Sequence, residues 1–146
     1  MTADTPAPSG AGLPPFCWPV RVYWEDTDAG GIVYYANYLK FFERARTEWL
    51  RAKGIHQQIL REQTGGMFVV SQAQINYLKS ARLDDELLLT TSLIQTGRVA
   101  MTIYQQARLM QPESQVLLCE ATIRASWVSA VGKPTRIPQV ILDKLL

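Results

Sequence analysis

The stretch YANYLKFFERARTEWLRAK, residues 35–53, decides the fold of this chain. Its apolar residues recur every three or four positions, the spacing that places side chains on one face of an α-helix. Glu48 and Arg51 lie three apart on the polar side, where an ion pair can support the helix, and Gly54 is a natural C-terminal stop. The apolar stripe consists of Tyr38, Phe41, Phe42, Ala45 and Trp49. Because this stripe is mostly aromatic, we expect the helix to be the central core element.

Elsewhere the pattern favours strands, because apolar and polar residues alternate with a period of 2. The expected order is a strand over 19–25, the long helix, a short helix over 55–65, strands over 69–77, 87–93, 99–108 and 117–127, and a terminal helix over 137–146. Short turns between the later strands predict antiparallel neighbours, and their one-sided apolar faces need the long helix as a cover. The fold class is therefore α+β, an antiparallel sheet wrapped around one long helix.

The organisation is that of a single domain with a leading tail. Residues 1–15 contain four prolines and two glycines, a composition that does not pack a core, so we expect a flexible tail there and one domain over 16–146.

Composition narrows the class of protein. The net charge is only +2 and the basic residues are scattered, so nothing predicts a nucleic-acid binder. Cys17 and Cys119 are isolated, which gives no zinc or redox signature, and we expect both to stay reduced. No signal-like segment opens the chain, and no apolar run approaches the ~20 residues of a membrane span. We expect a cytoplasmic protein, with peripheral contact with the inner membrane left open.

His56 is the only histidine in the chain, and no motif surrounds it. Catalysis by a Ser-His-Asp or Cys-His group, or a histidine-based metal site, would have to use this residue. We expect an ordinary surface or partly buried residue instead, with no metal and no separate cofactor.

The chemistry is concentrated in the turn-rich segment DTDAGG, residues 26–31, between a strand and the long helix. Asp26 and Asp28 place two carboxylates on a loop held by rigid elements, and the glycines, Gly31 included, let backbone approach a ligand. The helix start offers free N–H groups that can stabilise a developing negative charge on a carbonyl oxygen. A helix cap or a local turn around either aspartate is the alternative interpretation.

A longer block, YWEDTDAGGIVYYANY over residues 23–38, resembles the signature of the 4-hydroxybenzoyl-CoA thioesterase family, most closely its Tol–Pal-associated (YbgC-like) branch. The resemblance continues through residues 39–50, resumes in 68–70 and 77–85, and covers roughly residues 18–135. It implies a hot-dog fold, dimers joined edge to edge and often tetramers, with the active site at the dimer interface. The function implied is hydrolysis of acyl-CoA thioesters.

The resemblance also implies roles for residues. The family's catalytic aspartate falls on Asp28, and the backbone N–H at Tyr35 would polarise the thioester carbonyl. Many members of the nearest branch have histidine at the position of Tyr35, so a contribution from an imidazole would be missing here. Asp28 could activate water or attack the thioester directly, and the sequence does not separate these routes.

Substrate contacts can be expected on both halves of the ligand. Close to the helix start, the segment Gly31, Ile32, Val33 and Tyr34 could contact the acyl group. Candidates for the CoA phosphates are Arg98, Lys133 and Arg136, with Arg82 a weaker fourth. CoA enters only as part of the substrate. Acyl carrier protein and phospholipid-synthesis enzymes are possible partners beside a homo-oligomer.

Two rival functions remain. Hot-dog dehydratases typically use a catalytic histidine, and His56 lies outside the motif, which counts against that class. A non-catalytic acyl-CoA or acyl-carrier binding module would keep the pocket and bind thioester without turnover.

Overall fold

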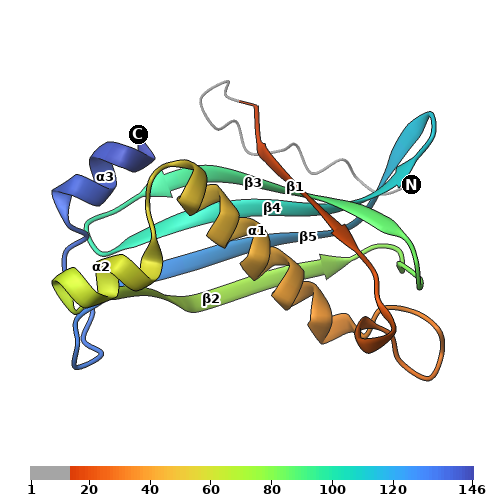
Figure 1. Cartoon of the computed structure of the whole chain (residues 1–146), viewed down its shortest axis with the longest axis horizontal. Helices are drawn as coiled ribbons and strands as arrows, with labels where there is room; N and C mark the ends of the chain where they lie inside the picture. The colour runs from red at the N-terminus through yellow and green to blue at the C-terminus, as the bar shows by residue number, and fades with distance from the viewer. Residues whose placement is uncertain (1–13) are drawn as a thin grey trace.

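Five antiparallel strands form one sheet that curls around a long helix (Figure 1). The structure is a computed structural model that describes residues 14–146, so the tail predicted over 1–15 lies almost entirely outside the described residues. The elements are β1 (Phe16–Arg21), η1 (Trp24–Asp26), η2 (Tyr35–Asn37), α1 (Tyr38–Ala52), α2 (Gln57–Thr64), β2 (Met67–Tyr77), β3 (Glu86–Thr96), β4 (Ala100–Gln111), β5 (Ser114–Val128) and α3 (Gln139–Leu145). The predicted α+β class is confirmed.

The order of the strands corrects one expectation. The sheet runs β1-β3-β4-β5-β2, so β3–β4 and β4–β5 are hairpin neighbours as predicted, but β2 does not pair with β3. Instead β2 pairs with β5, and the segment 78–85 carries the chain across to the other side of the sheet. Strands β4 and β5 therefore lie between β2 and β3, and the connection over 78–85 is not a hairpin turn.

The first strand is shifted from its predicted position. Strand β1 ends at Arg21, whereas the predicted strand extended to residue 25, and residues 24–26 form a 3-10 turn instead. The Asp26 carboxylate accepts the backbone N–H of Tyr23 at 2.8 Å, and this local bond competes with a strand ladder. The β-forming residues in 20–24 predicted a longer strand because the strand pattern does not take this local side-chain bond into account.

Helix α1 is the core element that the sequence predicted. All five stripe residues are buried, together with Leu50, and they pack against the inner face of the sheet. The helix proper begins at Tyr38 rather than Tyr35, because the preceding three residues form the separate 3-10 turn η2. That turn sets the geometry of the helix start.

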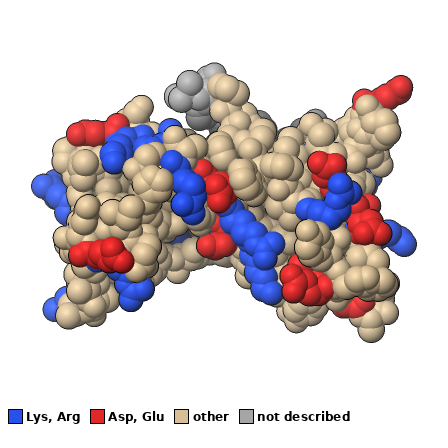
Figure 2. Space-filling model, in the orientation of Figure 1, with Lys and Arg blue, Asp and Glu red and all other residues tan. Residues whose placement is uncertain are grey.

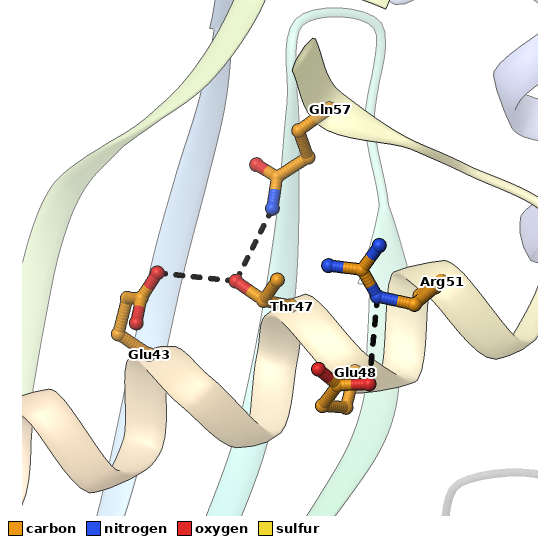
Figure 3. A network of polar contacts seen from close by, with 5 residues as sticks. All are labelled: Glu43, Thr47, Glu48, Arg51 and Gln57. Carbon is orange, nitrogen blue, oxygen red and sulfur yellow. Dashed lines mark hydrogen bonds and ion pairs between the residues drawn. The ribbon is translucent and has the colours of Figure 1, made fainter. Parts of the chain in front are cut away.

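The outer face of α1 is polar. The predicted pair is present, with Arg51 Nε 3.5 Å from Glu48 Oε2, and Gln57 of α2 donates to Thr47 at 3.3 Å (Figure 3). On the face shown in Figure 2, basic and acidic side chains are interspersed rather than gathered into one patch.

Strand β2 forms one edge of the sheet and is largely uncovered. Its central residues, 70–74, are exposed, and a bulge between Val70 and Gln72 interrupts the predicted alternation of faces. At the opposite edge, β1 has only six residues and contains Pro19. The long edge at β2 therefore presents unpaired backbone groups that another strand could use.

Candidate active site

The loop from β1 to α1 is organised by Asp26, which is only 4% exposed. Besides its carboxylate bond to the Tyr23 amide, its carbonyl oxygen accepts the Tyr34 N–H at 3.0 Å and the Asn37 side-chain amide at 2.9 Å. These bonds tie the loop to both of its flanking turns. Asp26 therefore shapes the loop.

Asp28 is the exposed acid of the pair. Its Oδ1 accepts the Gly30 N–H at 2.8 Å, and its backbone exchanges bonds with Ile32 and Gly31. The local turn weighed as an alternative is thus present. It engages one carboxylate oxygen, and no partner for Oδ2 is found within residues 14–146. The turn therefore fixes the side chain and leaves one oxygen free for chemistry.

The two glycines of the loop leave room for its tight turn. A Cβ on Gly30 would lie 3.2 Å from Asp28 Oδ1, closer than most side chains tolerate. Gly31 has φ +79°, the left-handed region that favours glycine. The turn thus depends on glycine at position 31, and a side chain at position 30 would crowd the Asp28 carboxylate.

Asp28 opens into a cavity of about 230 Å³ at the start of α1. The lining consists of Asp28, Ile32, Val33, Tyr35, Tyr38, Tyr77, Leu78, Lys79 and Ser80. The carboxylate therefore shares a cavity with aromatic rings and with one cation, Lys79. Such a mixture of apolar walls and few polar groups is typical of small-molecule sites.

Tyr35 is the first residue of η2, and its backbone N–H has no partner within the turn because the first amides of a helix lack one. No other acceptor for this N–H is found in the described part of the chain. The carbonyl of Tyr34 accepts the Asn37 N–H at 2.8 Å, and because a trans peptide is planar this fixes the opposed direction of the Tyr35 N–H. Asp28 and Tyr35 thus line one cavity, and the Tyr35 amide at the helix start is without an acceptor in the described residues.

Two of the four residues predicted to contact the acyl group line the cavity, and two do not. Ile32 and Val33 line the cavity with Asp28, although Val33 is also a core residue at 3% exposure. Gly31 and Tyr34 do not line it. Tyr34 is exposed, and the neighbouring Tyr35 phenol raises the pKa of the Tyr34 phenol.

The predicted phosphate-binding residues lie at the other end of the molecule. Arg98 and Arg136 line a separate cavity of about 660 Å³, while Lys133 is exposed on the turn after β5 and does not line it. Arg98 lies just before β4, which begins at Ala100. Further along β4, Ala107 is in register with Cys119 of β5, and Cys119 is in register with Tyr77 of β2, which lines the Asp28 cavity. Seven residues of antiparallel strand span about 24 Å, so these cations do not reach Asp28 within one protomer.

Some residues of the site escaped the sequence analysis. The sequence pattern places Tyr38 in the core and gives no role to four other residues that line the cavity, Tyr77, Leu78, Lys79 and Ser80. Arg82, the weaker phosphate candidate, pairs with Ile32 and so lies closer to Asp28 than the other three. The resemblance of residues 77–85 to the family was the sequence feature that could have identified these cavity residues.

The structure gives no support to histidine-based catalysis or to a metal site in the described residues. His56 is exposed at the start of α2, away from the Asp28 cavity. Among residues 14–146 there is no group of three or more His, Cys, Asp or Glu side chains placed to hold a metal ion. In the same residues, no helix is long and apolar enough to cross a membrane.

Comparison with known proteins agrees with this geometry. The thioesterase-like superfamily profile matches residues 22–145. The chain is 43% identical to acyl-CoA thioesterase YbgC of Haemophilus influenzae over 86% of this chain and 90% of that protein, and 41% identical to acyl-CoA thioester hydrolase YbgC of Escherichia coli over 87% and 92%. A crystal structure of a probable thioesterase from Bartonella henselae superposes with a TM-score of 0.78 at 32% identity, covering 86% of this chain and all of that one. The hot-dog fold is confirmed, and the chain belongs to the YbgC-like branch of the thioesterase-like superfamily.

Proposed function

We propose that this chain hydrolyses acyl-CoA thioesters to the free acid and CoA, with Asp28 as the reacting carboxylate. The observation that carries the proposal is the single cavity shared by Asp28 and the Tyr35 helix start. The names of the relatives, acyl-CoA thioesterase and acyl-CoA thioester hydrolase, support the same reaction.

In this mechanism the thioester carbonyl oxygen accepts the Tyr35 N–H, which stabilises the oxyanion as the carbonyl carbon becomes tetrahedral. Asp28 can remove a proton from an attacking water, after which the intermediate collapses to the acid and the CoA thiolate. Alternatively Asp28 attacks the carbon itself, expels the thiolate and leaves a mixed anhydride that water hydrolyses. In both routes the oxygen free of the Gly30 bond, Oδ2, is the one positioned to act.

The test is thiol release from short, long and aromatic acyl-CoAs by wild type and Asp28→Asn. Asn keeps the size and can retain the Gly30 bond but cannot serve as base or nucleophile, so we expect kcat to fall about 10²- to 10⁴-fold. A variant retaining near-full turnover would remove Asp28 from the mechanism. Tight acyl-CoA binding without turnover in the wild type would instead favour the binding-module function.

The proposal includes a homodimer formed through β2. The exposed strand of 11 residues supports antiparallel pairing with a second copy about a two-fold axis. Strand β2 begins near the Arg98 end of the molecule and ends at Tyr77 beside Asp28, so this pairing would turn the partner's basic end toward the Asp28 cavity. Arg98, Lys133 and Arg136 would then bind the CoA phosphates in the partner's site. Assembly into a tetramer is not needed for this arrangement.

Mixed dimers test the arrangement across the interface. Asp28→Asn is co-expressed with the double variant Arg98→Ala/Arg136→Ala and assayed at acyl-CoA well below KM. Random pairing makes about half of the dimers mixed, and each then holds one intact site, so we expect recovery of about a quarter of wild-type activity. Absence of recovery would refute the arrangement of Asp28 and the arginines across the interface, because each mixed dimer would then hold no intact site. Arg51→Ala, which removes a surface charge paired with Glu48, is the control for KM.

The cellular setting is part of the same proposal and follows from the family resemblance. We place the enzyme in the cytoplasm, in reach of the inner membrane and the Tol–Pal system, with acyl carrier protein or phospholipid-synthesis enzymes as partners. Co-purification of the tagged chain with acyl carrier protein, compared with a β2-edge variant, would test the first of these.

A further inference from the structure

The wall of the Asp28 cavity contains a tyrosine cluster, defined here as Tyr35, Tyr38 and Tyr77, that joins three segments of the chain. The rings of Tyr35 and Tyr77 meet edge to face with centroids 5.9 Å apart, and those of Tyr38 and Tyr77 lie 5.8 Å apart. Tyr38 is buried, and its hydroxyl accepts the Ala81 N–H at 3.2 Å. Helix start, strand end and the 78–85 segment are thereby held together.

One contact in this cluster bears on the reaction. The Tyr77 hydroxyl, at the end of β2, donates to the Tyr35 carbonyl oxygen at 3.1 Å. The peptide on the other side of the Tyr35 Cα is held by the Asn37 bond to Tyr34. Both peptide planes that flank the Tyr35 Cα are therefore pinned, one by a local backbone bond and one by a side chain 42 residues away. The long-range pin couples the helix start to the sheet.

We propose that Tyr77 is a positioning residue that aims the Tyr35 amide at the thioester carbonyl, an inference that rests on the proposed function. A transition-state hydrogen bond depends on the donor direction, and a donor held in advance needs no reorganisation during the reaction. Without the Tyr77 bond, the one-turn helix η2 is held only by its local bonds and by the Asn37 side-chain bond to Asp26, and no bond among the described residues ties it to the sheet, so the amide samples more directions.

The phenol suits this task over the neutral pH range. Burial, together with the nearby Cys119 and Tyr35, raises the pKa of Tyr77 above its ordinary value, so the hydroxyl stays protonated and can donate. Tyr77 has no bond to Asp28 among the described contacts, so it acts through Tyr35 rather than on the carboxylate.

The test is Tyr77→Phe, which keeps the ring and its packing and removes only the hydroxyl. We expect kcat for acyl-CoA hydrolysis to fall about 5- to 10-fold, the effect of one ordinary hydrogen bond felt in the transition state. KM and the affinity for a non-hydrolysable thioether analogue should stay within about twofold, because the bond does not contact the ligand. Tyr104→Phe, which loses a hydroxyl bonded to Glu120 on β5, is the matched control and should keep wild-type kcat.

A double-mutant cycle separates positioning from general damage. Tyr35→Pro removes the amide N–H, so adding Tyr77→Phe to it should lower kcat no further. Equal losses in both backgrounds, or a wild-type kcat in Tyr77→Phe, would overturn the role. A wild type that releases no thiol from any acyl-CoA would instead overturn the proposed function itself.

Amide hydrogen exchange provides a second measurement that does not depend on activity. Faster exchange in residues 34–38 of Tyr77→Phe, with unchanged protection in β4 and β5, is the expected result. Unchanged exchange in 34–38 would overturn the inference even if kcat fell. If exchange rose throughout the sheet, the hydroxyl would be a general stabiliser, which also contradicts a positioning role.

Discussion

Replacing Tyr35 with proline removes one hydrogen-bond donor from the candidate site and little else of the backbone. Tyr35 is the first residue of η2, the helix position where proline is best tolerated because its N–H has no helical partner. Proline also restricts the residue before it to extended conformations. Tyr34 already has φ −62° and ψ 128°, which satisfies that restriction. The substitution should therefore fold, and Tyr35→Ala is its control because it removes the side chain and keeps the N–H.

The size of the effect follows from the single donor and its surroundings. Losing one oxyanion donor costs about 10²- to 10³-fold in kcat where the site is closed to water. The Tyr35 side chain is 61% exposed in one protomer, so water can partly replace the lost N–H, and we expect the lower end, about 100-fold. Tyr35→Ala should lose less than about tenfold, because its amide remains.

The assay is steady-state thiol release with one acyl-CoA, with kcat and KM measured for wild type and both variants. Circular dichroism and the melting temperature check that the proline variant is folded. A kcat for Tyr35→Pro within about threefold of Tyr35→Ala would refute the assignment of the oxyanion donor to this N–H. If both variants lost activity to the same extent, the Tyr35 side chain rather than its backbone N–H would be the group that contributes to catalysis.

Three further predictions concern stability and reactivity. Gly66→Ala should lower the free energy of unfolding by about 2 kcal/mol in urea titration, because a Cβ there would lie 2.5 Å from the Trp127 ring; no change would mean the ring moves aside freely. Asp26→Ala should cost about 2 kcal/mol, since it removes the buried carboxylate that accepts the Tyr23 N–H, and kcat should fall with it; full activity would separate Asp26 from the site. Burial raises the pKa of the Cys119 thiol to about 12, so iodoacetamide at neutral pH should label the exposed Cys17 alone, as mass spectrometry would show; two labels per chain would contradict this.

The order of the strands and the residues that wall the cavity could not be predicted from the sequence. Period and turn length identified four of the strands and the aromatic helix, but they did not reveal that β2 crosses to β5 rather than pairing with β3. Likewise the DTDAGG loop was recognisable, whereas the Tyr77 bond to Tyr35 joins residues 42 positions apart. No local pattern encodes that bond, because the partners meet only once the sheet has curled around α1.

The sequence by itself determined the helical stripe, the strand-rich remainder and the acidic loop, because each depends on side chains within a few residues of one another. Tertiary structure alone decided which carboxylate oxygen is free, which side chains wall the cavity, and that Arg98 and Arg136 line a different cavity from Asp28 in the same protomer. Those properties are distances between segments remote in the chain, and only the packing of the sheet against the helix sets them.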